Sequence, residues 1–191
     1  MPRAVHFFSV LPLLFAGCAP NVELVLRQPF APPAQQNLRL TSDRGYHAVA
    51  DDRRACVFTF PLPGAVDGPR AFVMYLSAPK ELGVLPVAPE GPRGVRGFLI
   101  QELGALAGRS DLVGGTVRYR KVFLAPRLLR LDLHVRTDDG AEIVGRAMVE
   151  EAPRAILVFE REFAADVARV TPPTTQPAEE EAETPPALTT P

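Results

Sequence analysis

Residues 128–150 read LLRLDLHVRTDDGAEIVGRAMVE, and this stretch predicts a β-hairpin with a defined register. Asp138, Asp139 and Gly140 form the predicted loop, because a three-residue hairpin loop combines a type I turn with a glycine at positive φ. The loop sets Thr137 opposite Ala141. One face then pairs only apolar residues, namely Val135 with Ile143, Leu133 with Gly145, Leu131 with Ala147 and Leu129 with Val149.

The opposite face of this hairpin is mostly polar. Its pairs are Arg136 with Glu142, His134 with Val144, Asp132 with Arg146 and Arg130 with Met148. A two-residue loop would set charged positions against the apolar ones. Because a slip of one residue exchanges the two faces of a strand, the pattern favours the three-residue loop.

The segment before it predicts a second hairpin, in which residues 115–124 pair with residues 128–137. A three-residue loop of Ala125, Pro126 and Arg127 connects the two strands. The resulting pairs are Tyr119 with Leu133, Val117 with Val135, Arg120 with Asp132 and Arg118 with His134. This register turns Lys121 toward the apolar side, a fault that a bulge near Val122 or an edge position would relieve.

Other short apolar runs, rich in valine, phenylalanine, leucine and isoleucine, indicate further strands. They occupy residues 21–27, 37–41, 45–50, 54–60, 70–77, 95–103 and 154–163. Eight to ten strands without intervening helices predict an all-β domain, either an antiparallel β-sandwich or a closed β-barrel. Helical spacing at the C-terminal end predicts a short helix that contains Phe159, Phe163, Val167 and Val170.

Composition divides the chain into four predicted parts. They are a leader at residues 1–17, an anchor with a first strand and linker at 18–36, the β domain at 37–170 and a disordered tail at 171–191. The tail consists mainly of threonine, proline, glutamate and alanine, which cannot bury enough apolar surface to fold. Within the domain, residues 61–69 and 79–94 read as long proline-rich connectors and residues 108–115 as a turn.

The charges of the chain nearly balance. The 191 residues include 21 basic and 22 acidic side chains, for a net charge of −1. Nucleic-acid binding requires a clustered basic footprint. The composition therefore gives no indication of a nucleic-acid partner.

The leader has the features of a secretory signal. Arg3 supplies a positive charge, and an apolar stretch follows at residues 4–15. This stretch is too short for an ordinary transmembrane helix, which needs about 20 residues. The first 17 residues therefore predict export of the chain.

The segment Leu14-Phe15-Ala16-Gly17-Cys18 resembles the lipobox of bacterial lipoproteins. The small residues Ala16 and Gly17 match that pattern, whereas Phe15 stands where leucine is usual. The resemblance implies that a diacylglyceryl group, with acyl chains such as palmitate, is attached to the thiol of Cys18 and that the chain is cut before it. The alternative is a plain secretory leader in which Cys18 is incidental.

Such an anchor would hold the protein on the cell envelope. Each buried methylene contributes ~0.8 kcal/mol, and two or more acyl chains bind a membrane stably. If the host has two membranes, Ala19 after the cysteine resembles the class that is sorted to the outer membrane. The expected partner is therefore the membrane, reached through lipid on Cys18.

The second cysteine, Cys56, alternates with phenylalanines in Ala55-Cys56-Val57-Phe58 and is predicted to be an inert core thiol. The cysteines and histidines do not show the spacing of a metal site, and we expect no cofactor.

If both hairpins form, one sheet face displays a cluster of polar side chains. They are Arg118, Arg120, Arg130, Arg136, Arg146 and His134, around Asp132 and Glu142. The face is either a solvated surface with cross-strand ion pairs of ~0.2–1 kcal/mol each or an anion-binding surface. Arginine forks suit carboxylates and phosphates, so lipid head groups or cell-wall polymers are the ligands considered.

Catalysis has little support in the sequence. His134 and Asp132 share a face, but the pattern places no serine or cysteine nucleophile beside them. Ser110 and Asp111 read as turn residues, and His47 reads as a strand residue. We therefore expect a non-enzymatic envelope lipoprotein with a binding or structural role. Its candidate partners besides the membrane are envelope proteins, lipid head groups and cell-wall polymer. The alternatives are a carrier with a cavity between its sheets and an envelope hydrolase.

Overall fold

The hairpin at residues 128–150 forms in the predicted register. The computed structural model describes residues 21–31, 33, 36–50, 53–61, 70–91, 93–102 and 107–171. β9 (Leu128–Thr137) pairs with β10 (Glu142–Glu151), and all eight predicted pairs are present. The Thr137 N–H donates to the Ala141 carbonyl at 2.9 Å, and Gly140 has a φ of 83°. The predicted turn is confirmed.

The second hairpin forms, but its register differs by two residues from the prediction. β8 (Gly108–Lys121) pairs Val117 with Leu133 and Tyr119 with Leu131. The connection is the six-residue stretch 122–127, which makes two successive turns in place of one. A shift of two residues keeps each side chain on its predicted face.

Two local predictions for β8 are wrong. Residues 108–115 are strand and not turn, because the bulge lies between Leu112 and Gly114 and lets the strand continue. The bulge expected near Val122 is therefore in a different place. Lys121 does point to the apolar side, but it lies at the strand end, where it is exposed.

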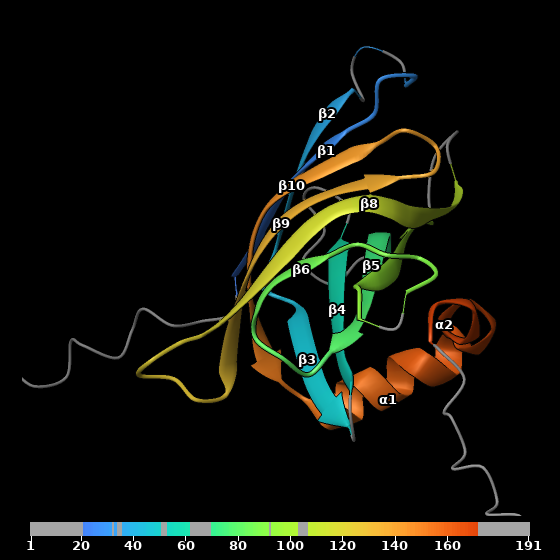
Figure 1. The fold of residues 1–191 in the computed structure, drawn as a ribbon. Helices are drawn as coiled ribbons and strands as arrows, with labels where there is room; N and C mark the ends of the chain where they lie inside the picture. Colours follow the sequence, from blue (N-terminus) through green and yellow to red (C-terminus); the bar gives the residue numbers. More distant parts are fainter. Residues whose placement is uncertain are drawn as a thin grey trace, which may run out of the picture.

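The described residues form ten strands, and seven of them close into a barrel (Figure 1). The barrel consists of β3 (Gly45–Ala50), β4 (Arg53–Pro61), β5 (Arg70–Pro79), β7 (Arg96–Gln101), β8, β9 and β10. Closure is completed where β10 pairs with β3 in parallel, at Glu150 with Tyr46 and Glu151 with His47. The all-β prediction is confirmed, and of the two architectures the barrel is the correct one.

The three remaining strands extend the barrel wall. β1 (Asn21–Arg27) pairs with the first seven residues of β10, and β2 (Asn37–Ser42) pairs with β1. β6 (Gly83–Pro86) pairs with β8, inside the segment predicted as a plain connector. β8, β9 and β10 therefore project beyond the closed part of the barrel and carry extra strands there.

The barrel interior holds the main hydrophobic core. Alternate residues of the strands point inward and form one continuous cluster, whose largest members are Tyr119, Phe58, Phe60, Leu24, Leu26, Met74 and Leu76, each less than 2% exposed. Side chains can fill a barrel of about eight strands. This is the arrangement of a packed core.

A second core lies outside the barrel, under two C-terminal helices (Figure 1). α1 (Pro153–Glu162) and α2 (Ala164–Val170) cover β3, β4, β5 and β7. Ile156, Phe159 and Val167 pack on outward residues such as Tyr75 and Phe98. The predicted C-terminal helix is confirmed.

The strand predicted at residues 154–163 is wrong, because these residues form α1. Pro153 occupies the first turn of the helix, where its missing N–H costs nothing. Ile156 and Phe159 lie on one buried stripe, whereas Leu157 and Val158 are exposed. A strand would have turned Leu157 and Phe159 to the same side, and only the helix separates them.

Candidate functional site

The polar face predicted from the sequence exists on the outside of the sheet. We use this name for the outward side chains of β8, β9 and β10, namely Arg118, Arg120, Arg130, Asp132, His134, Arg136, Glu142 and Arg146. Inward neighbours such as Val117, Leu131, Leu133 and Val135 are buried in the barrel. The structure brings all eight predicted residues onto one surface.

Each of the two acids on the polar face contacts two basic side chains. Asp132 contacts Arg130 at 3.2 Å and Arg120 at 3.7 Å. Glu142 contacts His134 Nε2 at 2.7 Å and Arg27 at 2.8 Å. Hydrogen bonds from His134 and Arg27 hold the pKa of the Glu142 carboxyl below its usual value.

Arg27 and Glu23 belong to this surface, and sequence reasoning missed both. They lie on β1, which is adjacent to β10 only in the folded barrel: Arg27 is opposite Glu142, and Glu23 is opposite Arg146. The alternation of residues 21–27 indicated which side chains of β1 share a face. It did not indicate which strand β1 would join.

Three arginines of the polar face have no acidic partner in the described part of the chain. Among the residues that the structure describes, no carboxylate lies within 4.0 Å of the guanidinium nitrogens of Arg118, Arg136 or Arg146. Arg136 lies opposite Glu142 and Arg146 lies opposite Asp132, as predicted, but the two acids contact other basic side chains instead. The face therefore has free positive charge.

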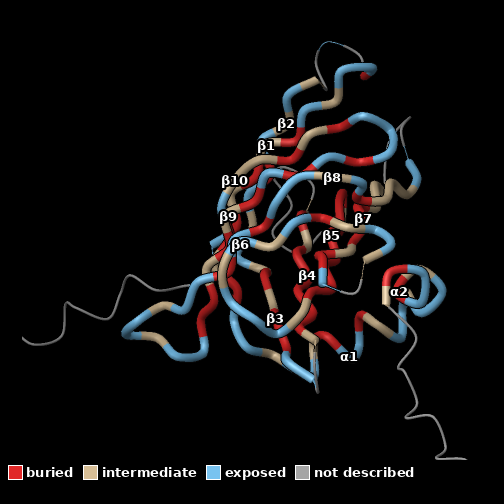
Figure 2. Tube along the Cα trace, in the orientation of Figure 1, coloured by how far each residue is buried: buried red, intermediate tan, exposed pale blue. Residues whose placement is uncertain are grey.

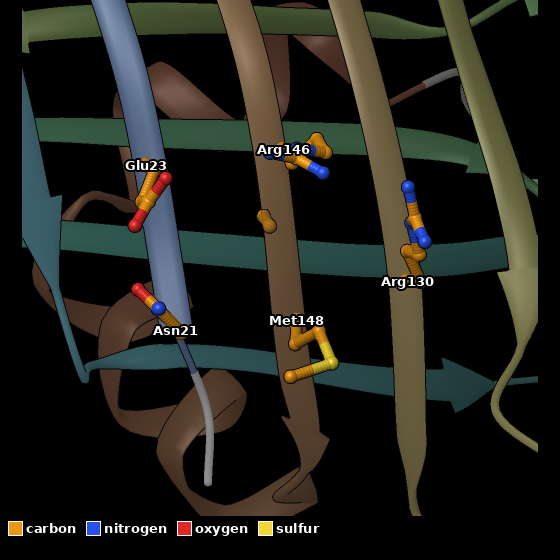
Figure 3. Close-up of a pocket in the computed structure, with 6 residues that line it drawn as sticks. Asn21, Glu23, Arg130, Arg146 and Met148 are labelled. Carbon is orange, nitrogen blue, oxygen red and sulfur yellow. The ribbon is translucent and has the colours of Figure 1, made fainter. Parts of the chain in front are cut away.

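A groove crosses the polar face between β1, β10 and β9 (Figure 3). It encloses about 280 Å³ and is lined by Asn21, Glu23, Arg130, Arg146, Ala147 and Met148. Arg130 and Arg146 reach into it from neighbouring strands, whereas Glu23 lies on the far side of Arg146 (Figure 3). The groove thus offers two guanidinium groups and one carboxylate to a small polar ligand.

His47 is a strand residue, as the sequence predicts, and it lies away from the polar face. It is buried in β3, and its Nε2 is 3.3 Å from the Arg127 carbonyl oxygen. Because a carbonyl only accepts, Nε2 carries the proton in the neutral ring. Burial is the main reason that the pKa of His47 lies below its usual value. His134 is exposed on β9, so the two histidines do not share a site.

The pKa of His47 leads to an expected pH dependence of stability. Below about pH 6.5, the usual His value, the unfolded chain binds a proton that the buried ring resists. The free energy of unfolding should therefore fall as pH drops through about 6.5 and below, toward the lower pKa of the folded state. Urea unfolding of His47→Gln should show a smaller fall over this range. His134→Gln is the control, and equal slopes for wild type and His47→Gln would contradict the assignment.

Ser110 and Cys56 carry nucleophilic atoms, but within the described part of the chain neither has catalytic surroundings. Ser110 donates a hydrogen bond to the Asp139 carboxylate at 2.8 Å and has no histidine beside it among the described contacts. Cys56 is fully buried in the barrel, and this burial raises the pKa of its thiol to about 12. A thiol with such a pKa stays protonated at neutral pH and is a poor nucleophile.

The described part of the chain contains neither a metal-ligand cluster nor a membrane-spanning helix. There, no three histidine, cysteine, aspartate or glutamate side chains come together as a metal site would require. Neither described helix has the length and apolar character needed to cross a bilayer. Cys18, the predicted lipid attachment site, lies outside the described residues.

In comparisons with protein families, curated proteins and solved structures, nothing matches this chain.

Proposed function

We propose that this protein is a lipoprotein of the bacterial cell envelope, anchored by lipid on Cys18, that acts by binding or by its structure and not by catalysis. The resemblance of residues 14–18 to a lipobox is the first support. The second is the geometry of β1, which relates the anchor to the barrel.

The position of β1 carries the proposal. β1 begins at Asn21, three residues after Cys18, and pairs with β10 along its whole length. Three residues span at most about 10 Å. A lipid on Cys18 would therefore hold the barrel directly at the membrane surface, without a long linker.

The replacement Cys18→Ala tests the anchor. In the bacterial host, wild-type protein should sediment with membranes, and mass spectrometry should find a mature chain that begins at Cys18 with acyl chains attached. Cys18→Ala should lose the acyl mass and the cleavage before residue 18, because the acceptor thiol is gone. Cys56→Ala is the matched control, since it removes the other cysteine and should leave the anchor intact. An unmodified thiol in the wild-type protein would refute the proposal.

A second candidate function, anion binding by the polar face, is favoured by one observation. Arg118, Arg136 and Arg146 have no carboxylate partner among the described residues. A guanidinium group without a protein partner is free to bind a carboxylate or phosphate through two parallel hydrogen bonds. The candidate ligand is an acidic cell-wall polymer, whose repeated anionic groups would meet several arginines of the face at once.

The double replacement Arg118→Ala with Arg146→Ala tests this second candidate. If the face binds acidic polymer, sedimentation with purified cell-wall sacculi should weaken by about fivefold for each charge removed, the effect expected near an anionic surface. The control is Arg154→Ala with Arg161→Ala on the exposed side of α1, which removes the same charge elsewhere. Equal sacculus binding by both double variants would mean that the polar face is only a solvated surface.

A further inference from the structure

The loop between β8 and β9 exposes two large apolar side chains. Phe123 is 97% exposed and Leu124 is 83% exposed, and Figure 2 shows the loop as an exposed projection from the barrel. A single exposed leucine on a protein surface needs no explanation. Two adjacent apolar residues at the tip of a projecting hairpin are the pattern of a surface that meets another apolar phase.

The loop is held in shape although its tip is exposed. The Ala125 N–H donates to the Val122 carbonyl at 3.2 Å, and the Leu128 N–H donates to the Ala125 carbonyl at 2.8 Å. At the base of the loop, the Arg127 carbonyl accepts the Glu151 N–H at 2.8 Å. Phe123 and Leu124 are thus presented to solvent by an ordered backbone.

Strand register places this loop at the anchor end of the molecule. Asn21 of β1 lies opposite Met148 of β10, Met148 lies opposite Arg130 of β9, and Arg130 lies opposite Arg120 of β8. Beyond this row, β8 and β9 continue into residues 122–127. The chain before Asn21 leaves β1 at the same end of the sheet, since β1 runs antiparallel to β10.

The distances match as well. Phe123 and Leu124 lie three and four residues beyond Arg120, past the end of β8, so they lie at most about 10–14 Å beyond that row. Cys18 lies three residues before Asn21, and an extended chain spans about 10 Å over that interval. Lipid on Cys18 can therefore lie at the same level as the Phe123–Leu124 tip.

The charges around the tip suit a membrane surface. Arg120, Lys121 and Arg127 flank the apolar pair, and all three are exposed. Two acids, Glu150 and Glu151, end β10 behind the loop, on the side toward the barrel. An apolar tip with a cationic collar is the combination that binds the boundary between head groups and acyl chains.

We propose that residues 122–127 form a membrane-contact loop that dips into the same bilayer as the Cys18 anchor, with Phe123 and Leu124 among the upper acyl chains and Lys121 and Arg127 at anionic head groups. The loop gives the domain a second point of attachment. The level of the bilayer in this argument rests on the proposed anchor, whereas the loop's affinity for lipid does not.

The absence of tryptophan from the chain makes a clean test available. Phe123→Trp and Phe30→Trp each introduce one fluorophore, at positions that are 97% and 88% exposed in the wild type. Phe30 lies beside Gly140, at the opposite end of β9, which at ~3.3 Å per residue is about 30 Å away. Both variants therefore replace an exposed phenylalanine by tryptophan and differ in where the tryptophan lies.

Each full-length variant would be purified from host membranes and reconstituted into vesicles of phosphatidylcholine and phosphatidylglycerol that carry bromine on the acyl chains. The indole of Phe123→Trp is expected to emit at shorter wavelength and to be quenched by bromine, while the indole of Phe30→Trp emits as it does in water. Adding Leu124→Asp to Phe123→Trp should reverse both changes. Quenching of the two indoles alike, or of neither, would overturn the proposal.

Mass spectrometry of the same samples separates this proposal from the anchor. If the Phe123→Trp protein is acylated but its indole is unquenched, the loop proposal is refuted and the anchor stands. If the same variant carries no acyl chains but its indole is quenched when vesicles are added, the anchor is refuted and the loop is supported. Circular dichroism of each variant establishes that the barrel is folded before the fluorescence is compared.

Discussion

Replacing Phe58 with alanine is expected to lower the free energy of unfolding by about 3–5 kcal/mol, the usual cost of deleting a fully buried aromatic ring. Phe58 lies on β4, is 0% exposed and belongs to the continuous cluster inside the barrel. Since a domain of this size has a total stability of about 5–15 kcal/mol, much of the margin would be lost.

Urea unfolding measures this effect, and Phe30→Ala is the matched control. Phe30 is 88% exposed, so its removal should change stability by no more than about 0.5 kcal/mol. The result also bears on function. A cost below about 1 kcal/mol for Phe58→Ala would mean that the barrel interior tolerates empty space, as a carrier of lipids or small molecules would require.

Gly115→Ala is the second large effect, with an expected cost of at least about 3 kcal/mol from combined strain and collision. Gly115 follows the bulge in β8 and has a φ of 106°, which residues other than glycine rarely adopt. A Cβ there would also lie 2.1 Å from the His134 carbonyl oxygen and 2.7 Å from the Val135 Cα. Both atoms are backbone of the paired strand β9, so neither can move aside alone.

Gly83→Ala separates the two causes. Gly83 has a comparable φ of 120°, but no described atom lies within 4 Å of a Cβ built on it. Its replacement should cost only the backbone strain, about 1–2 kcal/mol. Thermal unfolding of both variants gives the comparison, and equal losses would mean that β8 and β9 separate easily at the bulge.

The two proposed membrane contacts together define the orientation of the domain on the membrane. β1, β9 and β10 lead from the anchor end toward the turn at residues 138–140, so their common direction points away from the bilayer. The polar face then runs parallel to the membrane normal and is open to the envelope space. In that orientation Arg146 and its groove remain accessible while the protein is anchored.

The two hairpins show how far local pattern alone predicts register. The turn at residues 138–140 depends only on the three residues that form it, so the pairing of the two strands could be predicted from them. The connection at residues 122–127 has six residues, and Pro126 fits several turns. The Arg127 carbonyl accepts the Glu151 N–H and lies 3.3 Å from His47 Nε2, and no rule of local spacing predicts contacts with residues so far along the chain.

The amino-acid order was enough to predict the all-β class, the register of β9 with β10, the polar and apolar faces of the sheet and the helical spacing after Phe159, because each depends on neighbouring residues and on strand or turn periodicity. The closure of the sheet and the pairing of β1 with β10 became known only from the folded chain. Closure rests on the pairing of residues 46–47 with 150–151, and the contact of Arg27 with Glu142 spans 115 positions. Such contacts depend on how all strands curl together, which no single segment encodes.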